Sequence, residues 1–448
     1  MRERTLIGDL GNHVGKTVII KGWVDVRRDH GKLVFLDIRD RSGKVQSVCL
    51  PNHAEAVATA QTVRPEWVLQ IEGVMNERPE KMRTEGINGN VELEALTITV
   101  LTKAQELPFE KDTEVNIDTY LDNLPLTLRS ERARAIFKVQ TEIVKTYRSF
   151  LDAEGFMEFQ APKLTGDDAE GGANVFSVPY FNKKIAHLAT SPQFYKQIMV
   201  GVFERVYAIG NVFRAEKHST TRHLNEYISM DMEMSFINDH RDLMEVQTRF
   251  MHALVAHLEK SCQQEFNTLG ATLPKVPQQF PVLKLREALE LIFKETGRDH
   301  RSEPDLDPED ERWLSEWALQ EHMTDFIFIT HYPMAKRPMY TYEDPEDKGY
   351  TRSFDLLFRG VEITTGSQRR HDYDDLVAGI KMKGLNPETF SYYLQAFKFG
   401  MPPHGGWGMG LERLTQKMLG LANVKEAALF PRDMNRIDTL LSDPSVTE

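Results

Sequence analysis

Charged side chains gather in one segment near the middle of the chain, at spacings that suit a phosphate-bearing ligand. Arg214 and Glu216 lie two residues apart, so on a strand both side chains would point to the same face. Arginine can bind a phosphate, and glutamate can accept a hydrogen bond from an exocyclic amine. Arg222 and His223 follow in a polar loop and add cations suited to a polyphosphate tail. On residue types alone, a surface cluster of ion pairs is the alternative.

A second candidate is the glycine-rich segment 405–410, which is followed closely by Glu412 and Arg413. Its glycines match a loose dinucleotide-binding pattern. No βαβ unit surrounds them and no later acidic residue supports the match, so that interpretation is not favoured. Glycines in front of a helix that carries Arg413 instead allow a flat ligand to lie against the backbone.

The elements that must position these residues divide the chain into two parts. Within residues 1–104, five stretches of alternating or apolar residues predict five strands, with one helix over 54–61. This pattern predicts a small five-stranded β-barrel of the oligonucleotide-binding (OB) type. Seven basic residues against four acidic ones within 21–44 form a local stripe that would attract RNA phosphates. A generic barrel with a solvated strand face is the alternative.

The remaining residues predict a larger domain of another class. Residues 105–130 carry little periodicity and two prolines and are interpreted as a hinge, after which 131–448 form the second domain. Ser130 can cap a long amphipathic helix that ends at Gly155. The later strands do not alternate regularly with helices, which favours an antiparallel α+β domain over a doubly wound sheet. The charged, proline-spaced segment at about 266–325 is expected to be an insertion.

Composition excludes several classes of protein. Apolar residues make up 41% of the 448 residues and charged residues 27%, which is typical of a folded chain and not of a disordered one. The two cysteines, Cys49 and Cys262, cannot form a disulfide scaffold or an all-cysteine metal site. No run approaches the ~18 apolar residues of a membrane span, and no apolar signal core stands at the start. We therefore expect a cytoplasmic protein with no membrane partner. Most of the net charge of −12 lies beyond the barrel.

Three segments, taken in order, resemble motifs 1, 2 and 3 of the class II aminoacyl-tRNA synthetases. The helix and strand before Pro162 resemble motif 1, residues 213–233 resemble motif 2, and 405–413 resembles motif 3. The barrel in front and the string 189–197 narrow the resemblance to the aspartate, asparagine and lysine subgroup, and within it to the aspartate enzymes of the compact archaeal-like type. The resemblance covers essentially the whole chain. It implies an OB-fold anticodon-binding domain followed by a class II catalytic domain.

The resemblance implies that motifs 2 and 3 bind ATP. Arg214 would contact the α-phosphate, Glu216 the adenine amino group, and Tyr227 would stack on the adenine ring. The β- and γ-phosphates would be held by Arg222, His223 and Arg413.

A Mg²⁺ site is implied at Glu362 and Thr365, with Asp355 close to it, and oxygen ligands suit this ion. The alternative for the two carboxylates is a structural role, as buried strand residues paired with Arg359 or Arg369.

The resemblance also implies that the amino acid is L-aspartate. Lys196 and Arg369 would grip its side-chain carboxylate. The α-amino group would be held by Ser191, Gln193 and Asp231. Glu170 lies in the segment 166–172, which resembles the mobile loop that closes over the amino acid. Asparagine enzymes typically lack the lysine, because two fixed cations around an uncharged amide would be under-paired in a dry pocket.

The implied reaction has two steps and needs no protein nucleophile. The α-carboxylate of aspartate attacks the α-phosphorus of ATP, giving aspartyl-adenylate and pyrophosphate. The 3′ ribose hydroxyl of the terminal tRNA adenosine then attacks the mixed anhydride. Positioning and charge stabilisation by Arg214, Arg413 and Mg²⁺ would carry the first step, which makes the two arginines the catalytic residues.

The same resemblance assigns roles in the barrel and an assembly state. Phe35 would stack on an anticodon base, Gln46 would hydrogen-bond it, and Glu92 would be a third contact. Because Phe35 lies in an alternating strand, a plain core residue is the alternative. The motif 1 helix and strand imply a homodimer.

Several alternatives stay open. Asp25 and the loop 86–90 match no pattern that decides between tRNA-Asp alone and tRNA-Asp with tRNA-Asn, and charging of both would require an amidotransferase partner. An asparaginyl-tRNA synthetase is disfavoured by Lys196. A synthetase-derived RNA-binding module is disfavoured by the intact catalytic residues, and an amino-acid-amidating paralogue by the barrel.

Overall fold

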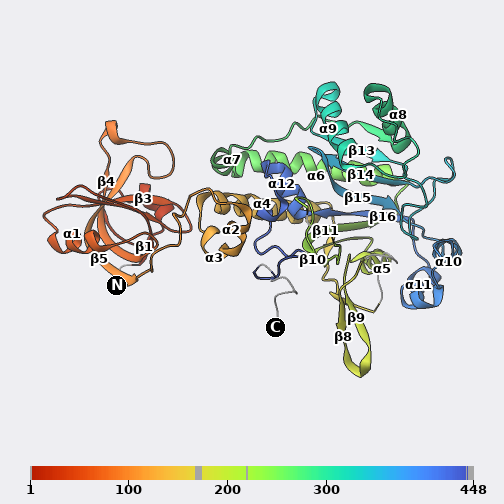
Figure 1. The fold of residues 1–448 in the computed structure, drawn as a ribbon, viewed down its shortest axis with the longest axis horizontal. Coiled ribbons are helices and arrows are strands. Elements are labelled where there is room, and N and C mark those ends of the chain that lie inside the picture. The colour runs from red at the N-terminus through yellow and green to blue at the C-terminus, as the bar shows by residue number, and fades with distance from the viewer. Residues whose placement is uncertain (1–2, 167–173, 218–219, 440, 442–448) are drawn as a thin grey trace. The chain divides into compact units, whose positions relative to one another are not determined.

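The computed structural model describes residues 3–166, 174–217, 220–439 and 441. The chain folds into two compact units, Met1–Glu110 and Lys111–Glu448 (Figure 1). Glu170, expected to close over the amino acid, lies outside the described residues.

The first unit is a closed barrel with the strand order β1-β2-β3-β5-β4. Helix α1 (Ala54–Thr62) connects the third strand to the fourth, as predicted, and a 3₁₀ turn (Ile7–His13) precedes the barrel. The strands are β1 (Thr17–Asp29), β2 (Val34–Arg39), β3 (Lys44–Cys49), β4 (Val68–Glu77) and β5 (Val91–Thr102). The expected five-stranded barrel is therefore confirmed.

Alternation along β2 separates the core of the barrel from its outer face. Val34, Leu36 and Ile38 are fully buried in one hydrophobic cluster that also includes residues of the other strands. Phe35 and Asp37 point the other way and stay partly exposed. Val34, Leu36 and Ile38 thus build the barrel core, and Phe35 and Asp37 are left for other contacts.

The second unit is built on an eight-stranded sheet with the order β12-β13-β14-β15-β16-β11-β10-β6. All neighbours are antiparallel except the two edge pairs, β12 with β13 and β6 with β10. The strands are β6 (Met157–Glu158), β10 (Arg205–Phe213), β11 (Glu226–Ser235), β12 (Val282–Lys284), β13 (Phe326–Thr330), β14 (Ser353–Phe358), β15 (Val361–Gln368) and β16 (His404–Gly410). This is the α+β class expected from the sequence.

Helices α4 (Glu131–Ala153), α6 (His240–Ser261), α7 (Gln263–Leu269) and α12 (Leu411–Leu419) pack with this sheet in one hydrophobic core. Ser130 caps α4, since its hydroxyl accepts a hydrogen bond from the Ala133 N–H at 3.2 Å. Tyr147 of α4 and Phe250 of α6 meet edge to face inside the core, with ring centroids 5.1 Å apart. The core holds the central strands, and with them the residues they carry, in fixed positions.

Two segments show more regular structure than their sequences indicated. Within 105–130, expected as a hinge, two short helices form, α2 (Ile117–Asp122) and α3 (Leu124–Thr127). Within 266–325, expected as an insertion, β12 extends the main sheet, and α8 (Leu285–Thr296) and α9 (Pro308–His322) share a hydrophobic cluster with β13 and β14. Helices α2 and α3 have only one or two turns, which is too short to show a clear helical period in the sequence.

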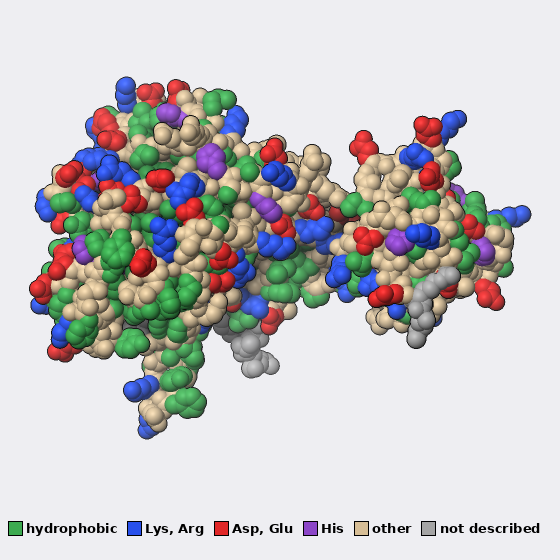
Figure 2. All heavy atoms as spheres, turned by 180° about the vertical axis from the view of Figure 1, so that it is seen from behind, with side chains coloured by type: hydrophobic (Ala, Val, Ile, Leu, Met, Phe, Trp, Pro, Cys, Tyr) green, Lys and Arg blue, Asp and Glu red, His purple; other side chains and the backbone are tan. Residues whose placement is uncertain are grey.

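A three-stranded sheet stands apart from the main one, with the order β7-β9-β8. It comprises β7 (Leu164–Thr165), β8 (Ser177–Pro179) and β9 (Ile185–Leu188), and its β8–β9 hairpin projects from the unit (Figure 1). Apolar and basic side chains lie together on this projection (Figure 2), among them Phe181, 77% exposed, and Lys184. Helices α5 (Gln193–Phe203), α10 (Tyr373–Met382) and α11 (Ser391–Lys398) complete the unit. Among the residues that the structure describes, no helix combines the length and the apolar character needed to cross a bilayer.

Candidate active site

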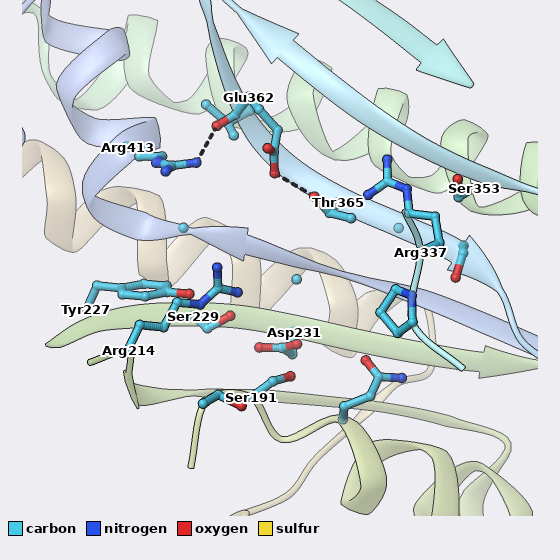
Figure 3. A pocket seen from close by; sticks show the side chains of 18 of the residues that line it. Ser191, Arg214, Tyr227, Ser229, Asp231, Arg337, Ser353, Glu362, Thr365 and Arg413 are labelled. Carbon is cyan, nitrogen blue, oxygen red and sulfur yellow. Dashed lines mark hydrogen bonds between the residues drawn. The ribbon is translucent and has the colours of Figure 1, made fainter. Parts of the chain in front are cut away.

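A cavity of about 520 Å³ opens over β11, β15 and β16 of the second unit. Figure 3 shows Arg214, Tyr227 and Asp231 along one wall and Glu362 and Arg413 along the opposite one. The structure brings together in its lining the following residues expected from the sequence: Ser191, Gln193, Lys196, Arg214, Glu216, Arg222, His223, Tyr227, Asp231, Glu362, Thr365, Arg369 and Arg413. Asp355 is not part of the lining but pairs with Arg337, which is.

Glycines in β16 allow the neighbouring strand to place its carboxylates beneath the cavity floor. A Cβ at Gly406 would lie 2.0 Å from the Met232 carbonyl oxygen and 2.3 Å from Glu233 Oε2. A Cβ at Gly408 would lie 3.1 Å from Asp231 Oδ1. The glycine run is therefore a packing requirement of the site, and not a dinucleotide-binding turn.

Two cations and two carboxylates form a buried network at the floor. Lys196 Nζ donates to Asp231 Oδ1 and to the Trp407 carbonyl oxygen, each at 2.9 Å, and lies 3.5 Å from Glu233 Oε2. Arg369 Nε donates to Glu233 Oε1 at 2.8 Å and its Nη2 to Oε2 at 3.2 Å. The Lys196 side chain is only 1% exposed. The network balances its own charge in a setting where an unpaired charge would be costly.

Glu233 is the member of this network to which the sequence assigned no role. Burial alone would raise its pKa, but the cations of Arg369 and Lys196 outweigh burial and hold the pKa of Glu233 below its ordinary value. Glu233 therefore stays ionised and fixes Arg369. The signal was present in the sequence, because Glu233 stands two residues after Asp231 and so shares its face of the strand.

Asp231, which lines the cavity, keeps one carboxylate oxygen outside the hydrogen bonds of the network. Its Oδ1 accepts from Lys196, whereas Oδ2 is buried and has no hydrogen-bond partner within the described part of the chain. An unsatisfied buried carboxylate oxygen favours a ligand that brings its own N–H groups. A protonated amine satisfies that requirement.

Arg214 and Tyr227 stand side by side at the other end of the cavity. The Arg214 guanidinium carbon lies 5.8 Å from the centroid of the Tyr227 ring, and Arg214 Nη1 lies 3.8 Å from Glu216 Oε1. The Asn225 side chain fixes their backbone by donating to the carbonyl oxygens of Arg214 at 2.6 Å and Glu216 at 3.0 Å. A flat aromatic ligand and its phosphate fit this combination of ring, guanidinium and carboxylate.

Arg413 connects the two walls. Its Nη1 donates to the Glu362 carbonyl oxygen at 3.2 Å, and its Nε to the Arg222 carbonyl oxygen at 3.4 Å. His223 Nδ1 lies 2.6 Å from Thr220 Oγ1. Arg413 of α12 is thus held against the backbone of the polar loop that carries Arg222 and His223.

Oxygen atoms suited to a divalent cation cluster at β14 and β15. Thr365 Oγ1 donates to Glu362 Oε1 at 2.5 Å. Burial raises the pKa of Glu362, but the cation of Arg413 and the Thr365 hydrogen bond, with Arg337 and Arg214, together outweigh burial and hold the pKa below its ordinary value, so the carboxylate is charged. Asp355 Oδ1 is buried without a hydrogen-bond partner among the described residues. An ionised carboxylate, a hydroxyl and an unsatisfied carboxylate oxygen fit Mg²⁺.

The alternative interpretation paired these carboxylates with Arg359 or Arg369, and that pairing is wrong. Asp355 accepts from Arg337 Nη2 at 2.7 Å, whereas Arg359 pairs with Asp325 and Arg369 with Glu233. Burial nevertheless raises the pKa of Asp355 to about 6. Arg337 lines the cavity and is a second residue that the sequence analysis missed, because it lies in a loop that carries no motif.

A separate candidate site lies on the outer face of the barrel. Gln46 Nε2 donates to Glu92 Oε2 at 3.2 Å, and Arg28 Nη2 donates to Gln46 Oε1 at 3.1 Å. Phe35 is the cross-strand partner of Arg28 and is partly exposed, so its interpretation as a plain core residue is wrong. The three expected residues share one face with an arginine, which suits an unstacked nucleic-acid base.

Comparison with known proteins identifies a family for each part of the chain. Residues 116–434 match the family described as tRNA synthetases class II (D, K and N), and residues 18–101 match the OB-fold nucleic acid binding domain. The chain is 45% identical to the aspartate–tRNA(Asp/Asn) ligase of Thermus thermophilus over 97% of this chain and 99% of that protein. It is 38% identical to the aspartate–tRNA(Asp) ligase of Pyrococcus abyssi over 94% of this chain and 96% of that protein.

Solved structures resemble the chain over nearly its whole length. Asparaginyl-tRNA synthetase from Pyrococcus horikoshii complexed with asparaginyl-adenylate has a TM-score of 0.89 at 30% identity, covering 98% of this chain and 100% of that one. Aspartyl-tRNA synthetase from Entamoeba histolytica has a TM-score of 0.85 at 30% identity, covering 97% and 93%. With its OB-fold barrel and its cavity of paired cations and carboxylates, the chain belongs to the class II tRNA synthetases of the D, K and N group.

Proposed function

We propose that this synthetase attaches L-aspartate to tRNA through an aspartyl-adenylate, using ATP and Mg²⁺. The observation that carries the proposal is the buried network of Lys196, Asp231, Glu233 and Arg369 at the floor of the cavity. The relatives named as aspartate–tRNA ligases support the same substrate.

The network favours aspartate over asparagine. Lys196 and Arg369 both line the cavity. Each also donates to a neutral group, the Trp407 carbonyl oxygen and Ser367 Oγ respectively, whose place a substrate carboxylate would take. An amide would bring no charge to the two cations and would lose charge-assisted hydrogen bonds. One oxygen of Asp231 has no hydrogen-bond partner among the described residues, and we assign it to accept from the substrate's α-ammonium group. Ser191 and Gln193 line the same cavity.

We assign the opposite end of the cavity to ATP. Tyr227 stacks on the adenine, Glu216 accepts from its amino group, and Arg214 contacts the α-phosphate. Arg222, His223 and Arg413 hold the β- and γ-phosphates. Glu362 and Thr365, with Asp355 nearby, would hold Mg²⁺, which neutralises phosphate charge when bound.

The chain's own groups then account for adenylate formation. The network orients the aspartate so that its α-carboxylate approaches the α-phosphorus in line. Arg214 stabilises the charge that builds on the α-phosphate oxygens, and Arg413 stabilises the departing pyrophosphate. The tRNA 3′ hydroxyl next attacks the carbonyl carbon of the adenylate, and AMP leaves.

We assign recognition of the anticodon to the barrel, over residues 1–104, and catalysis to residues 131–448. Phe35 offers a ring for stacking, and Gln46 and Glu92 offer hydrogen-bonding groups on the same face. We further propose that both tRNA-Asp and tRNA-Asn are substrates, since the Thermus thermophilus relative carries that double name. Aspartyl-tRNA-Asn then requires an amidotransferase to convert it.

We also propose a homodimer in the cytoplasm. Val202, Phe203 and Phe236 are exposed by 64%, 46% and 69%, and the Ser235 N–H bonds to the Glu204 carbonyl oxygen, so these apolar residues are close to one another. An apolar surface of this kind is typical of a subunit contact. The two cysteines are buried and unpaired, as in a reducing compartment.

Charging of purified tRNA transcripts tests the proposal. The enzyme is incubated with ATP, Mg²⁺ and labelled aspartate, with tRNA-Asp and tRNA-Asn in separate reactions, and with labelled asparagine in parallel. We expect aspartate on both transcripts and asparagine on neither. Aspartate on tRNA-Asp alone would overturn the double tRNA range. Asparagine charging would overturn the assignment of Lys196 and Arg369, and no charging would overturn the activity.

A further inference from the structure

Glu311 lies on α9 and contacts a residue of the cavity wall from behind. Its Oε2 accepts from Arg222 Nη2 at 2.8 Å. The side chain of Arg222 is 22% exposed and that of Glu311 only 9%. Arg222 lines the cavity, and Glu311 is not among the described residues that do. The carboxylate therefore grips one edge of the guanidinium and leaves the rest of it toward the cavity.

Helix α9 gives this carboxylate a rigid support. Leu314 and Ala318 of α9 are fully buried in one cluster with Ile327 and Ile329 of β13. Ser315 Oγ accepts a hydrogen bond from the Gly360 N–H at 2.9 Å, at the turn between β14 and β15. Glu311 is thus presented by an element that is packed against the main sheet.

The backbone around Arg222 is fixed by other elements, and its side chain by Glu311. The Arg222 carbonyl oxygen accepts from Arg413 Nε at 3.4 Å, and the Thr221 carbonyl oxygen accepts from the Val424 N–H at 2.9 Å. Nε of Arg222 is buried and has no hydrogen-bond partner in the described part of the chain. The direction of the guanidinium therefore depends on its ion pair with Glu311.

We propose that Glu311 is a positioning residue for the triphosphate of ATP, which acts by holding the Arg222 guanidinium with its remaining N–H groups toward the β- and γ-phosphates. This inference rests on the proposed function. Arginine suits the task, because its planar fork of five donors can bind a carboxylate along one edge and a phosphate along another. The segment around α9, expected only as an insertion, then contributes to the active site.

Aspartate-dependent exchange of pyrophosphate into ATP, measured on the full chain, tests the proposal. We expect Glu311→Gln to raise the KM for ATP about ten-fold while the KM for aspartate stays within about two-fold, because a charge-assisted hydrogen bond at the phosphate end is lost. Glu309→Gln is the matched control. Glu309 lies on the same helix, is 63% exposed and pairs with Arg298 away from the cavity, so both KM values should be unchanged.

A double-mutant cycle with Arg222→Ala separates positioning from a merely structural role. If Glu311 acts through Arg222, Glu311→Gln adds little to the KM for ATP once Arg222 is removed. An equal loss in both backgrounds, or no effect on the KM for ATP, would overturn the inference. If Glu311→Gln does not fold, the same cycle with Glu311→Asp decides the question. A wild-type enzyme without exchange would overturn the proposed function itself, whereas an active one with an additive cycle would overturn this inference alone.

Discussion

At the residue scale, Lys196 contributes both to the stability of the fold and to the choice of substrate. It is the shared partner of Asp231 and Glu233, and its side chain is almost fully buried. Lys196→Met leaves two buried carboxylates with one cation, so we expect a loss of about 3–5 kcal/mol in the free energy of unfolding and no aspartate-dependent exchange. Denaturant unfolding and exchange assays measure the two effects. Lys184→Met, at an exposed position, is the matched control and should change neither the stability nor the exchange activity. If Lys196→Met were as stable as the wild type, the buried network would be contradicted.

Glu412 gives the protein a pH-dependent stability with a definite sign. Burial raises its pKa to about 8, and both carboxyl oxygens lie 3.1 Å from the Ile228 N–H. Between about pH 5 and 8 the folded state keeps a proton that the unfolded state releases, so stability falls as pH rises, by at most ~1.4 kcal/mol per pH unit. Unfolding measured at several pH values should show that Glu412→Gln makes this slope smaller, while Asp355, whose pKa is raised to about 6, still contributes to it. The exposed Glu388→Gln should retain it. Equal slopes in wild type and Glu412→Gln would refute the shift.

The residues of the site that sequence could predict are those that carry motifs. The spacing of Arg214 with Glu216 and the glycines before Arg413 indicated a phosphate site, and the structure brings them to one cavity. Arg337 and Glu311 could not be found this way. They come from segments without a motif and reach the site only through tertiary packing, by pairing with Asp355 and Arg222. Glu233 could have been found, since its strand alternation with Asp231 was visible.

At the scale of elements, alternation along β2 separates folding from recognition. Phe35→Ala removes a partly exposed ring, so we expect a change in stability below ~1 kcal/mol. We also expect a rise in the KM for tRNA of about five-fold or more, since base–aromatic stacking contributes ~1–3 kcal/mol. Leu36→Ala removes a buried side chain of the next position and should cost ~2–5 kcal/mol of stability. Charging kinetics and unfolding measure both variants. A Phe35→Ala protein with a normal KM for tRNA would exclude the ring from recognition.

The elements themselves were predictable where a period runs long enough. The five barrel strands and the helix after Ser130 follow from alternation, helical spacing and a capping residue. The short helices α2 and α3 and the three-residue strand β12 do not, because so few residues carry almost no periodic signal. The place of β12 at the sheet edge depends on pairing with β13, whose partner residues are 46 positions further along the chain and cannot be found from local patterns.

At the scale of the whole molecule, each unit holds its own hydrophobic core. The barrel cluster runs from Ile7 to Ala95, and the clusters of the second unit lie between Ile136 and Ala427. We therefore expect a protein of residues 111–448 to catalyse aspartate-dependent exchange within a few-fold of the full chain but to lose tRNA charging. Exchange and charging assays on the two proteins measure this. A folded but exchange-inactive fragment would mean that adenylate formation depends on the barrel.

Separate cores also shape how the protein melts. Two regions that do not share a buried cluster need not unfold together, so heating should give two calorimetric transitions and not one cooperative endotherm. Leu36→Ala should then displace only the transition of the barrel, and Lys196→Met only that of the larger unit. The midpoint temperature of each transition then reports the stability of one unit. A variant that impairs anticodon reading by destabilising the barrel can therefore be distinguished by calorimetry from one that impairs amino-acid activation by destabilising the larger unit.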